Sequence, residues 1–161
     1  MRLLDTIDQN VPAGSHMVIF GIGDGGILYD NLHAETHPLN VTYATVYDFL
    51  NCLKISPCWS WLNSNETVRK FTSERAKNLS KVYAEIIAEK TYKNFDMVYY
   101  DFPAMEILER KVLEGGDPKK MIERCDGFHP NGEFHSYLAD WLWVKIKHEH
   151  PEWIGERNPH N

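Results

Sequence analysis

Short apolar runs alternate with longer amphipathic stretches along the chain. Residues 15–20 (SHMVIF) and 95–102 (FDMVYYDF) are apolar runs bounded by turn residues, which is typical of buried strands. Other stretches place apolar residues three or four positions apart, which predicts amphipathic helices. These predicted helices cover residues 43–53, 66–90, 104–113, and 132 or 133 to 150. The apolar face of the second helix is predicted to hold Val68, Phe71, Leu79, Val82, Tyr83, Ile86 and Ile87.

The order of these elements is strand, loop, helices, strand, helix, helix, which is the order of an α/β domain. Two strands alone make a poor sheet. We therefore expect that the N-terminal part of the domain, with its other strands, lies upstream of Met1. The last residues, 155–161, are expected to be irregular.

Composition narrows the class of protein. The chain has 161 residues, enough for one domain, and 43% of them are hydrophobic, which allows a real core. The net charge is −6 with no basic cluster, which argues against a nucleic-acid partner. No apolar run approaches about 18 residues, so no membrane span is expected. The first residues lack the apolar segment of a secretory signal peptide.

Two features are nevertheless typical of exported proteins. Asn40, Asn65 and Asn78 each begin an N-x-S/T glycosylation sequon. Cys52 and Cys58 could close a small disulfide loop across Pro57, or they could be two unrelated buried thiols. Cys125 is left over, either free or paired with a cysteine outside the chain.

The strongest candidate for catalysis is the segment CDGFHPNGEF. Asp126 and His129 lie three apart in a loop just before the last predicted helix, which Asn131 could cap. In this geometry the carboxylate can hold one ring nitrogen while the other nitrogen acts as a base. A turn aspartate and an unrelated histidine would give the same spacing, and Asp30 and His33 repeat it. Only the context separates the two pairs.

Two other motifs suggest different chemistry. Gly21–Gly26 (GIGDGG) matches G-x-G-x-x-G, but the following residues have no good helical spacing. A nucleotide-binding module is therefore less favoured than a glycine-rich turn. His33 and His37 could hold a metal if they lay on one helix, and a zinc hydrolase would add His129. The favoured interpretation is that His33 and His37 pack within a loop.

Several blocks, in order and spacing, resemble the acyloxyacyl hydrolases, a family within the SGNH (GDSL) class of serine esterases. The blocks span residues 11–159 and read GSHMVIFGIGDGGILYDNLHAETHPLN, TYATVYDFLNCLKISPC, TSERAKNLS, DGFHPN, LADWLW and WIGERNP. The resemblance implies an SGNH-hydrolase-like three-layer α/β/α sandwich with a mostly parallel sheet. Residues 1–161 would form the C-terminal part of one esterase domain. Asp126 and His129 match the family's D-x-x-H block and would be the orienting carboxylate and the base.

The resemblance also implies an activity. It would be hydrolysis of fatty-acyl esters by a Ser-His-Asp mechanism, on secondary acyl chains of bacterial lipopolysaccharide and on phospholipids. The family's G-D-S serine, oxyanion-hole residues and saposin-like domain have no match in this sequence. This chain alone is therefore expected to be inactive, and a non-catalytic fragment or pseudo-enzyme is the alternative. No cofactor or metal is expected in this segment, the family's calcium sites being upstream. The full-length protein is expected to be secreted or endolysosomal.

Overall fold

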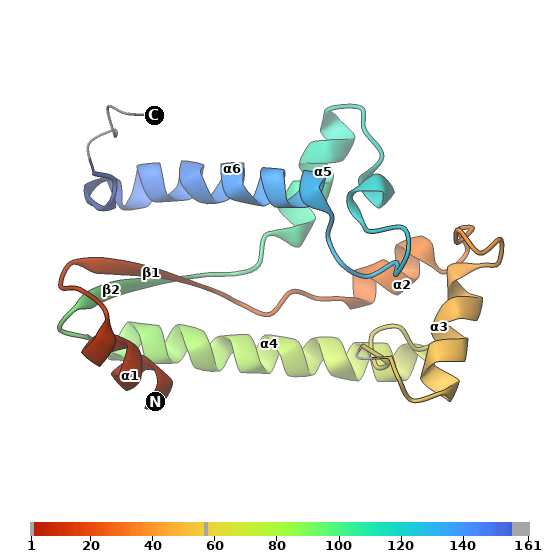
Figure 1. Cartoon of the computed structure of the whole chain (residues 1–161), viewed down its shortest axis with the longest axis horizontal. Coiled ribbons are helices and arrows are strands. Elements are labelled where there is room, and N and C mark those ends of the chain that lie inside the picture. Colours follow the sequence, from red (N-terminus) through yellow and green to blue (C-terminus); the bar gives the residue numbers. More distant parts are fainter. Residues whose placement is uncertain (1, 57, 156–161) are drawn as a thin grey trace.

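A parallel pair of strands forms the middle of three layers (Figure 1). The computed structural model describes residues 2–56 and 58–155. Strand β1 (Ser15–Phe20) pairs with β2 (Phe95–Tyr100), and helices α4 (Glu66–Glu89) and α6 (Gly132–Glu149) cover opposite faces (Figure 1). This arrangement confirms the predicted α/β class. The remaining elements are α1 (Arg2–Asn10), α2 (Gly26–Leu32), α3 (Tyr43–Cys52), α5 (Ala104–Leu113) and the 3₁₀ helices η1 (Pro118–Met121) and η2 (Pro151–Trp153).

Helix α4 approaches the sheet through small side chains. Its buried residues are Ala76 and Ser80, whereas Phe71 of the predicted apolar face is 70% exposed. The prediction of that face was therefore wrong in part. Small residues let the helix come close enough for the Ser80 hydroxyl to accept a hydrogen bond from the backbone N–H of Ile22, at 2.9 Å. That bond joins α4 to the chain just beyond β1.

Helix α6 packs on the other face through one large aromatic residue. The ring of Trp141 lies 5.6 Å from that of Tyr100 and 6.3 Å from that of Phe20, so it contacts both strands. The N-terminal end of α6 is capped as predicted. The Oδ1 atom of Asn131 accepts hydrogen bonds from the backbone N–H groups of Glu133 and Phe134 at 3.0 and 3.2 Å.

Two helices differ from the sequence-based expectation. The apolar spacing along the chain does not predict α1, and it argues against a helix where α2 lies. A helix of 7 residues such as α2 is marginal on its own, so tertiary packing decides whether it forms. The burial of Tyr29 and Leu32 in the core supplies that packing. The expected irregular tail from residue 156 onward lies outside the described residues.

Two hydrophobic clusters meet at the segment that leads into the Asp126–His129 loop. One cluster contains Tyr29, Leu32, Tyr43, Tyr47, Leu62 and Ile122. The other contains Ile107, Met121 and Phe134. Met121 and Ile122 are adjacent in the sequence, yet each is buried in a different cluster. The start of the loop is therefore held from both sides.

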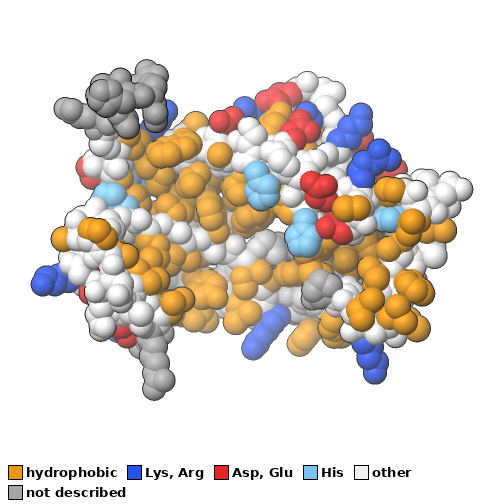
Figure 2. Space-filling model, viewed as in Figure 1, with side chains coloured by type: hydrophobic (Ala, Val, Ile, Leu, Met, Phe, Trp, Pro, Cys, Tyr) orange, Lys and Arg blue, Asp and Glu red, His pale blue; other side chains and the backbone are white. Residues whose placement is uncertain are grey.

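Much apolar surface stays exposed. Figure 2 shows hydrophobic side chains spread across the middle of one face. Among the described residues each strand has a single partner, so both outer edges of the sheet are open. No described helix has the length and apolar character needed to cross a bilayer. Exposed large apolar side chains include Phe49, Ile55, Trp59, Phe71, Leu113 and Val144.

Replacing Ser80 by Ala tests the contact between α4 and the end of β1. The Ile22 N–H would lose its acceptor, and we expect the free energy of unfolding to fall by about 1 kcal/mol. Equilibrium urea unfolding measures this change. The matched control is Ser136→Ala on an exposed position of α6, which should change stability by less than about 0.5 kcal/mol. Equal effects of the two substitutions would contradict this role of Ser80.

Candidate active site

Residues 121–131 form a loop that is closed by backbone hydrogen bonds. The N–H of Asn131 donates to the carbonyl of Met121 at 2.9 Å, and the N–H of Glu123 donates to the carbonyl of His129 at 2.8 Å. Within the loop, the N–H of Gly127 donates to the carbonyl of Glu123 at 2.9 Å. These bonds fix the backbone on both sides of Asp126, so its carboxylate and the His129 ring face each other within a short, rigid segment.

The predicted pair, Asp126 and His129, is in contact. The Nδ1 atom of His129 lies 2.7 Å from Oδ2 of Asp126, and Oδ1 accepts hydrogen bonds from the N–H groups of Phe128 and His129 at 2.8 and 3.0 Å. Partial burial of the carboxyl raises its pKa, but these hydrogen bonds outweigh burial, so the pKa of Asp126 lies below its ordinary value. Asp126 is therefore an ionised acceptor at neutral pH and orients the ring with a proton on Nδ1.

The other nitrogen of His129 is open. No described residue hydrogen-bonds to Nε2, and the side chain is 64% exposed. The ring of Phe128 meets it edge-on, with centroids 5.1 Å apart. With its proton on Nδ1, the imidazole presents an unshared pair at Nε2, which can take a proton from a hydroxyl group. The geometry is that of a base and its orienter.

The second D-x-x-H pair is not a dyad. The carboxylate of Asp30 bonds to the guanidinium of Arg69 at 3.1 Å. The Nδ1 atom of His33 bonds to the carbonyl of Tyr29 at 2.8 Å, and its ring stacks on that of Tyr29. The two side chains therefore bind different partners, and context separates the two pairs as expected.

His37 does not fit a metal site. Both of its ring nitrogens are used: Nδ1 accepts from the N–H of Leu39 at 3.1 Å, and Nε2 lies 3.0 Å from the carbonyl of Cys125. Among residues 2–56 and 58–155, no group of three or more His, Cys, Asp or Glu side chains could hold a metal ion. The alternative of a zinc site formed by His33, His37 and His129 is therefore wrong.

The glycine-rich loop is filled by protein side chains. A helix does begin at Gly26, contrary to the expectation from sequence. However, a Cβ atom at Gly23 would lie 2.8 Å from the ring of Phe102, and one at Gly25 would lie 2.8 Å from the ring of Trp61. These glycines make room for aromatic rings, which leaves no reason to place a pyrophosphate there.

The three cysteines in the described part of the chain are free thiols. The disulfide that Cys52 and Cys58 could form is therefore absent from this structure. Neither side chain is fully buried either, because Cys52 is exposed and Cys58 is half-buried. Cys125 is exposed. The sequon residues Asn40, Asn65 and Asn78 are all exposed, and their glycosylation stays a prediction.

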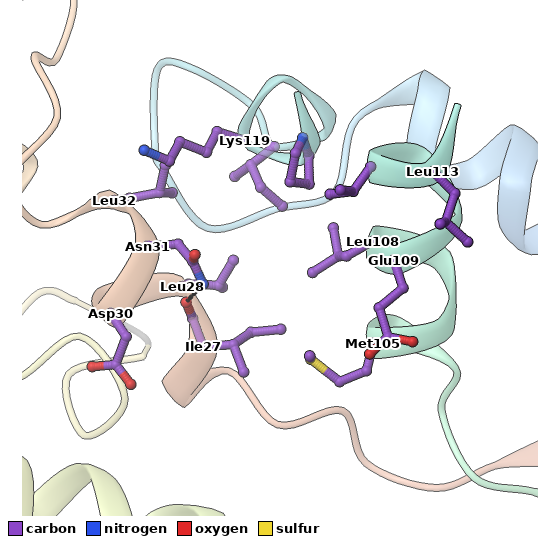
Figure 3. Close-up of a pocket in the computed structure, with 13 residues that line it drawn as sticks. Ile27, Leu28, Asp30, Asn31, Leu32, Met105, Leu108, Glu109, Leu113 and Lys119 are labelled. Atoms are coloured by element: carbon purple, nitrogen blue, oxygen red, sulfur yellow. Dashed lines mark hydrogen bonds between the residues drawn. The ribbon is translucent and has the colours of Figure 1, made fainter. Parts of the chain in front are cut away.

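An apolar pocket lies close to the loop. It has a volume of 530 Å³, and side chains of α2 and α5 face each other across it (Figure 3). A second pocket of 290 Å³ is lined by Phe128 and Pro130, the two neighbours of His129. The walls of these pockets come from distant parts of the chain, so no local sequence pattern predicts them. Both pockets share the side chains of Ile27, Leu28, Leu108 and Ile122.

Replacing Gly127 by Ala should disturb the loop. Gly127 has φ +63°, and an added Cβ would lie 2.5 Å from the Tyr47 hydroxyl oxygen. We expect urea unfolding to show a loss of about 3 kcal/mol, from backbone strain and overlap together. Gly115→Ala is the matched control, because Gly115 has φ +78° but nothing within 4 Å. It should lose only about 1 kcal/mol. Similar losses in the free energy of unfolding at both positions would argue against close packing of Gly127 on Tyr47 and Tyr43.

Comparison with known proteins identifies the family. The model of the GDSL-like Lipase/Acylhydrolase family matches residues 1–142. Acyloxyacyl hydrolases of Homo sapiens, Mus musculus and Oryctolagus cuniculus are 43%, 42% and 41% identical to this chain over 166 residues. The chain is covered completely, but it spans only 29% of the length of these relatives. Because the family model matches most of the chain, and the predicted resemblance is confirmed, this chain belongs to the GDSL-like lipase/acylhydrolase family.

Proposed function

We propose that this chain carries the acid–base half of the active site of a lipid acyl-ester hydrolase. The observation that carries the proposal is the 2.7 Å contact between Nδ1 of His129 and Oδ2 of Asp126, with Nε2 left open. The apolar pocket lined by Phe128 and Pro130 supports it, because an acyl chain needs such a surface beside the base. Family membership supports the same reaction class.

In the proposed mechanism, a serine hydroxyl attacks the acyl carbonyl of the ester. Nε2 of His129 takes the hydroxyl proton, and the Asp126 carboxylate stabilises the imidazolium that forms. Nε2 then gives the proton to the oxygen of the leaving alcohol. A water molecule, activated by the same nitrogen, releases the fatty acid. The serine and the oxyanion donors are proposed to come from sequence outside residues 1–161, because no G-D-S block occurs within them.

The proposed substrates are lipids with esterified fatty acids. The relatives are named acyloxyacyl hydrolases, which supports esters in which one fatty acyl chain is attached to another. Secondary acyl chains of bacterial lipopolysaccharide have this chemistry, and phospholipids are the proposed further class. No cofactor enters this mechanism, because the side chains move the proton themselves.

The proposed partners are other parts of the same protein. Residues 1–161 would form the C-terminal part of one SGNH-type domain, and its upstream part would cover open strand edges and exposed apolar surface. A saposin-like domain would present the lipid. The three exposed sequon residues support a secreted or endolysosomal glycoprotein.

Replacing His129 by Ala should abolish turnover. In the protein expressed from its complete coding sequence, we expect kcat for a fatty-acyl ester to fall by about 10⁴-fold or more, because the serine loses its base. Release of fatty acid from lipopolysaccharide and from phospholipid vesicles measures it. The 161-residue chain alone should release none.

The matched control is His33→Ala, which removes the histidine of the other D-x-x-H pair. It should keep kcat within about two-fold of the unsubstituted protein, because the hydrogen bond and the ring contact of the His33 side chain are to Tyr29 of α2 and not to the Asp126–His129 loop. A full-length protein without ester turnover would support the alternative of a non-catalytic relative. Turnover by the 161-residue chain, lost in His129→Ala, would contradict the need for an outside serine.

Replacing Leu108 by Trp tests the acyl pocket. Leu108 lines both pockets, so a larger side chain should shorten the acyl chains that fit. We expect kcat/KM for a long-chain ester to fall by about 10-fold relative to a short-chain ester. Val144→Trp, at an exposed position of α6, should leave the ratio unchanged. An unchanged ratio in Leu108→Trp would argue that acyl chains bind elsewhere.

A further inference from the structure

Three side chains from one segment donate hydrogen bonds to the loop that carries Asp126 and His129. The hydroxyl of Tyr47 donates to the carbonyl of Gly127 at 2.7 Å, and that of Tyr43 donates to the carbonyl of Arg124 at 2.7 Å. His37 bonds to the carbonyl of Cys125 at 3.0 Å. The three donors are buried, with exposed fractions of 0%, 5% and 5%. Their acceptors lie on both sides of Asp126.

The direction of the His37 bond follows from its second contact. The N–H of Leu39 donates to Nδ1 of His37 at 3.1 Å, so Nδ1 carries no proton. Nε2 therefore carries the proton and donates it to the carbonyl of Cys125. His37 is therefore a donor to the loop, as the two tyrosines are.

The Tyr47 bond continues into the catalytic pair. The carbonyl of Gly127 that accepts from Tyr47 belongs to the same peptide unit as the N–H of Phe128. That N–H donates to Oδ1 of Asp126 at 2.8 Å, while Oδ2 of Asp126 faces Nδ1 of His129 at 2.7 Å. Donation to a peptide oxygen polarises the N–H of the same peptide, so the bonds of such a chain strengthen one another. The hydroxyl of Tyr47 is thereby linked to the His129 ring through two groups, the peptide between Gly127 and Phe128 and the carboxylate of Asp126.

We propose that Tyr47 is a positioning residue for the catalytic pair, and that Tyr43 and His37 hold the loop beside it. Residues 37–47 would then set the angle of the Asp126 carboxylate and, through it, the orientation of the His129 ring. The expected effect on catalysis rests on the proposed function. The hydrogen bonds themselves are independent of it.

The chemical state of the donors agrees with this role. Burial raises the pKa of the Tyr47 and Tyr43 hydroxyls, and the negative charge of nearby Asp126 raises both further. Each hydroxyl therefore keeps its proton at any pH at which an esterase works, and each remains a donor. The two tyrosines near the ionised Asp126 carboxylate therefore add no negative charge to the half-buried loop.

Tyr47→Phe tests the proposal, because it removes the hydroxyl and keeps the ring. In the protein expressed from its complete coding sequence, we expect the pKa of Asp126 to rise towards its ordinary value, measured by ¹³C NMR of labelled aspartate. The downfield proton resonance of Nδ1 in His129 should shift upfield. With a fatty-acyl ester, kcat should fall between about 10-fold and 100-fold while KM changes by less than about two-fold.

Two further variants make the result specific. Tyr29→Phe is the matched control, because Tyr29 packs in the same cluster, 6.1 Å from the Tyr47 ring, and among described residues makes no hydrogen bond to the loop. It should leave the Asp126 pKa, the His129 resonance and kcat unchanged. His37→Asn is the second probe, since its amide oxygen can still accept from Leu39 but its short side chain cannot reach Cys125. It should change the same three readouts in the same direction as Tyr47→Phe, more weakly, and it replaces Tyr47→Phe if that variant does not fold.

The outcomes separate the two proposals. Unchanged Asp126 and His129 signals in Tyr47→Phe and His37→Asn, as in Tyr29→Phe, would overturn the positioning role. Changed signals with an unchanged kcat would also overturn it. Absence of ester turnover in the unsubstituted protein would overturn the proposed function, while the NMR signals would still decide whether the hydrogen-bond chain exists.

Discussion

Met121 and Ile122 anchor the loop on which the candidate site depends. Their side chains are buried in two different hydrophobic clusters, so the backbone that enters the loop cannot rotate without opening one of them. Ten residues later Asn131 returns to the carbonyl of Met121 and caps α6. The loop is therefore fixed at both ends by packing and capping, and Asp126 and His129 lie on a rigid segment of backbone.

The loop lies between two hydrophobic clusters and belongs to neither a sheet nor a helix. Its buried carbonyl groups therefore need hydrogen-bond donors from elsewhere in the chain. The buried side chains of Tyr43, Tyr47 and His37 donate hydrogen bonds to three of these carbonyl groups. The same bonds that prevent an unpaired carbonyl also define where the Asp126 carboxylate points. Stability of the loop and orientation of the His129 ring thus arise from one set of hydrogen bonds.

Small residues at several positions let helices and aromatic rings come close to the backbone. The glycines of the GIGDGG loop leave room for Phe102 and Trp61, and Ala76 and Ser80 let α4 reach the chain beyond β1. The rings of Phe102 and Trp61, which pack against Gly23 and Gly25, form part of the wall of the pocket lined by Phe128 and Pro130. A motif that resembles a nucleotide loop therefore serves packing next to an apolar pocket.

Local sequence patterns were enough to predict both strands, the helices with strong apolar periodicity, the cap at Asn131 and the Asp126–His129 candidate, because these depend on neighbours a few residues apart. Only the tertiary structure separated that pair from Asp30 and His33, since spacing is identical and the partners differ. It also decided the buried side of α4, the formation of α2 and the hydrogen bond of Tyr47 to the loop. Those outcomes depend on contacts between residues that lie tens of positions apart, 80 in the case of Tyr47 and Gly127, and a local pattern carries no record of them.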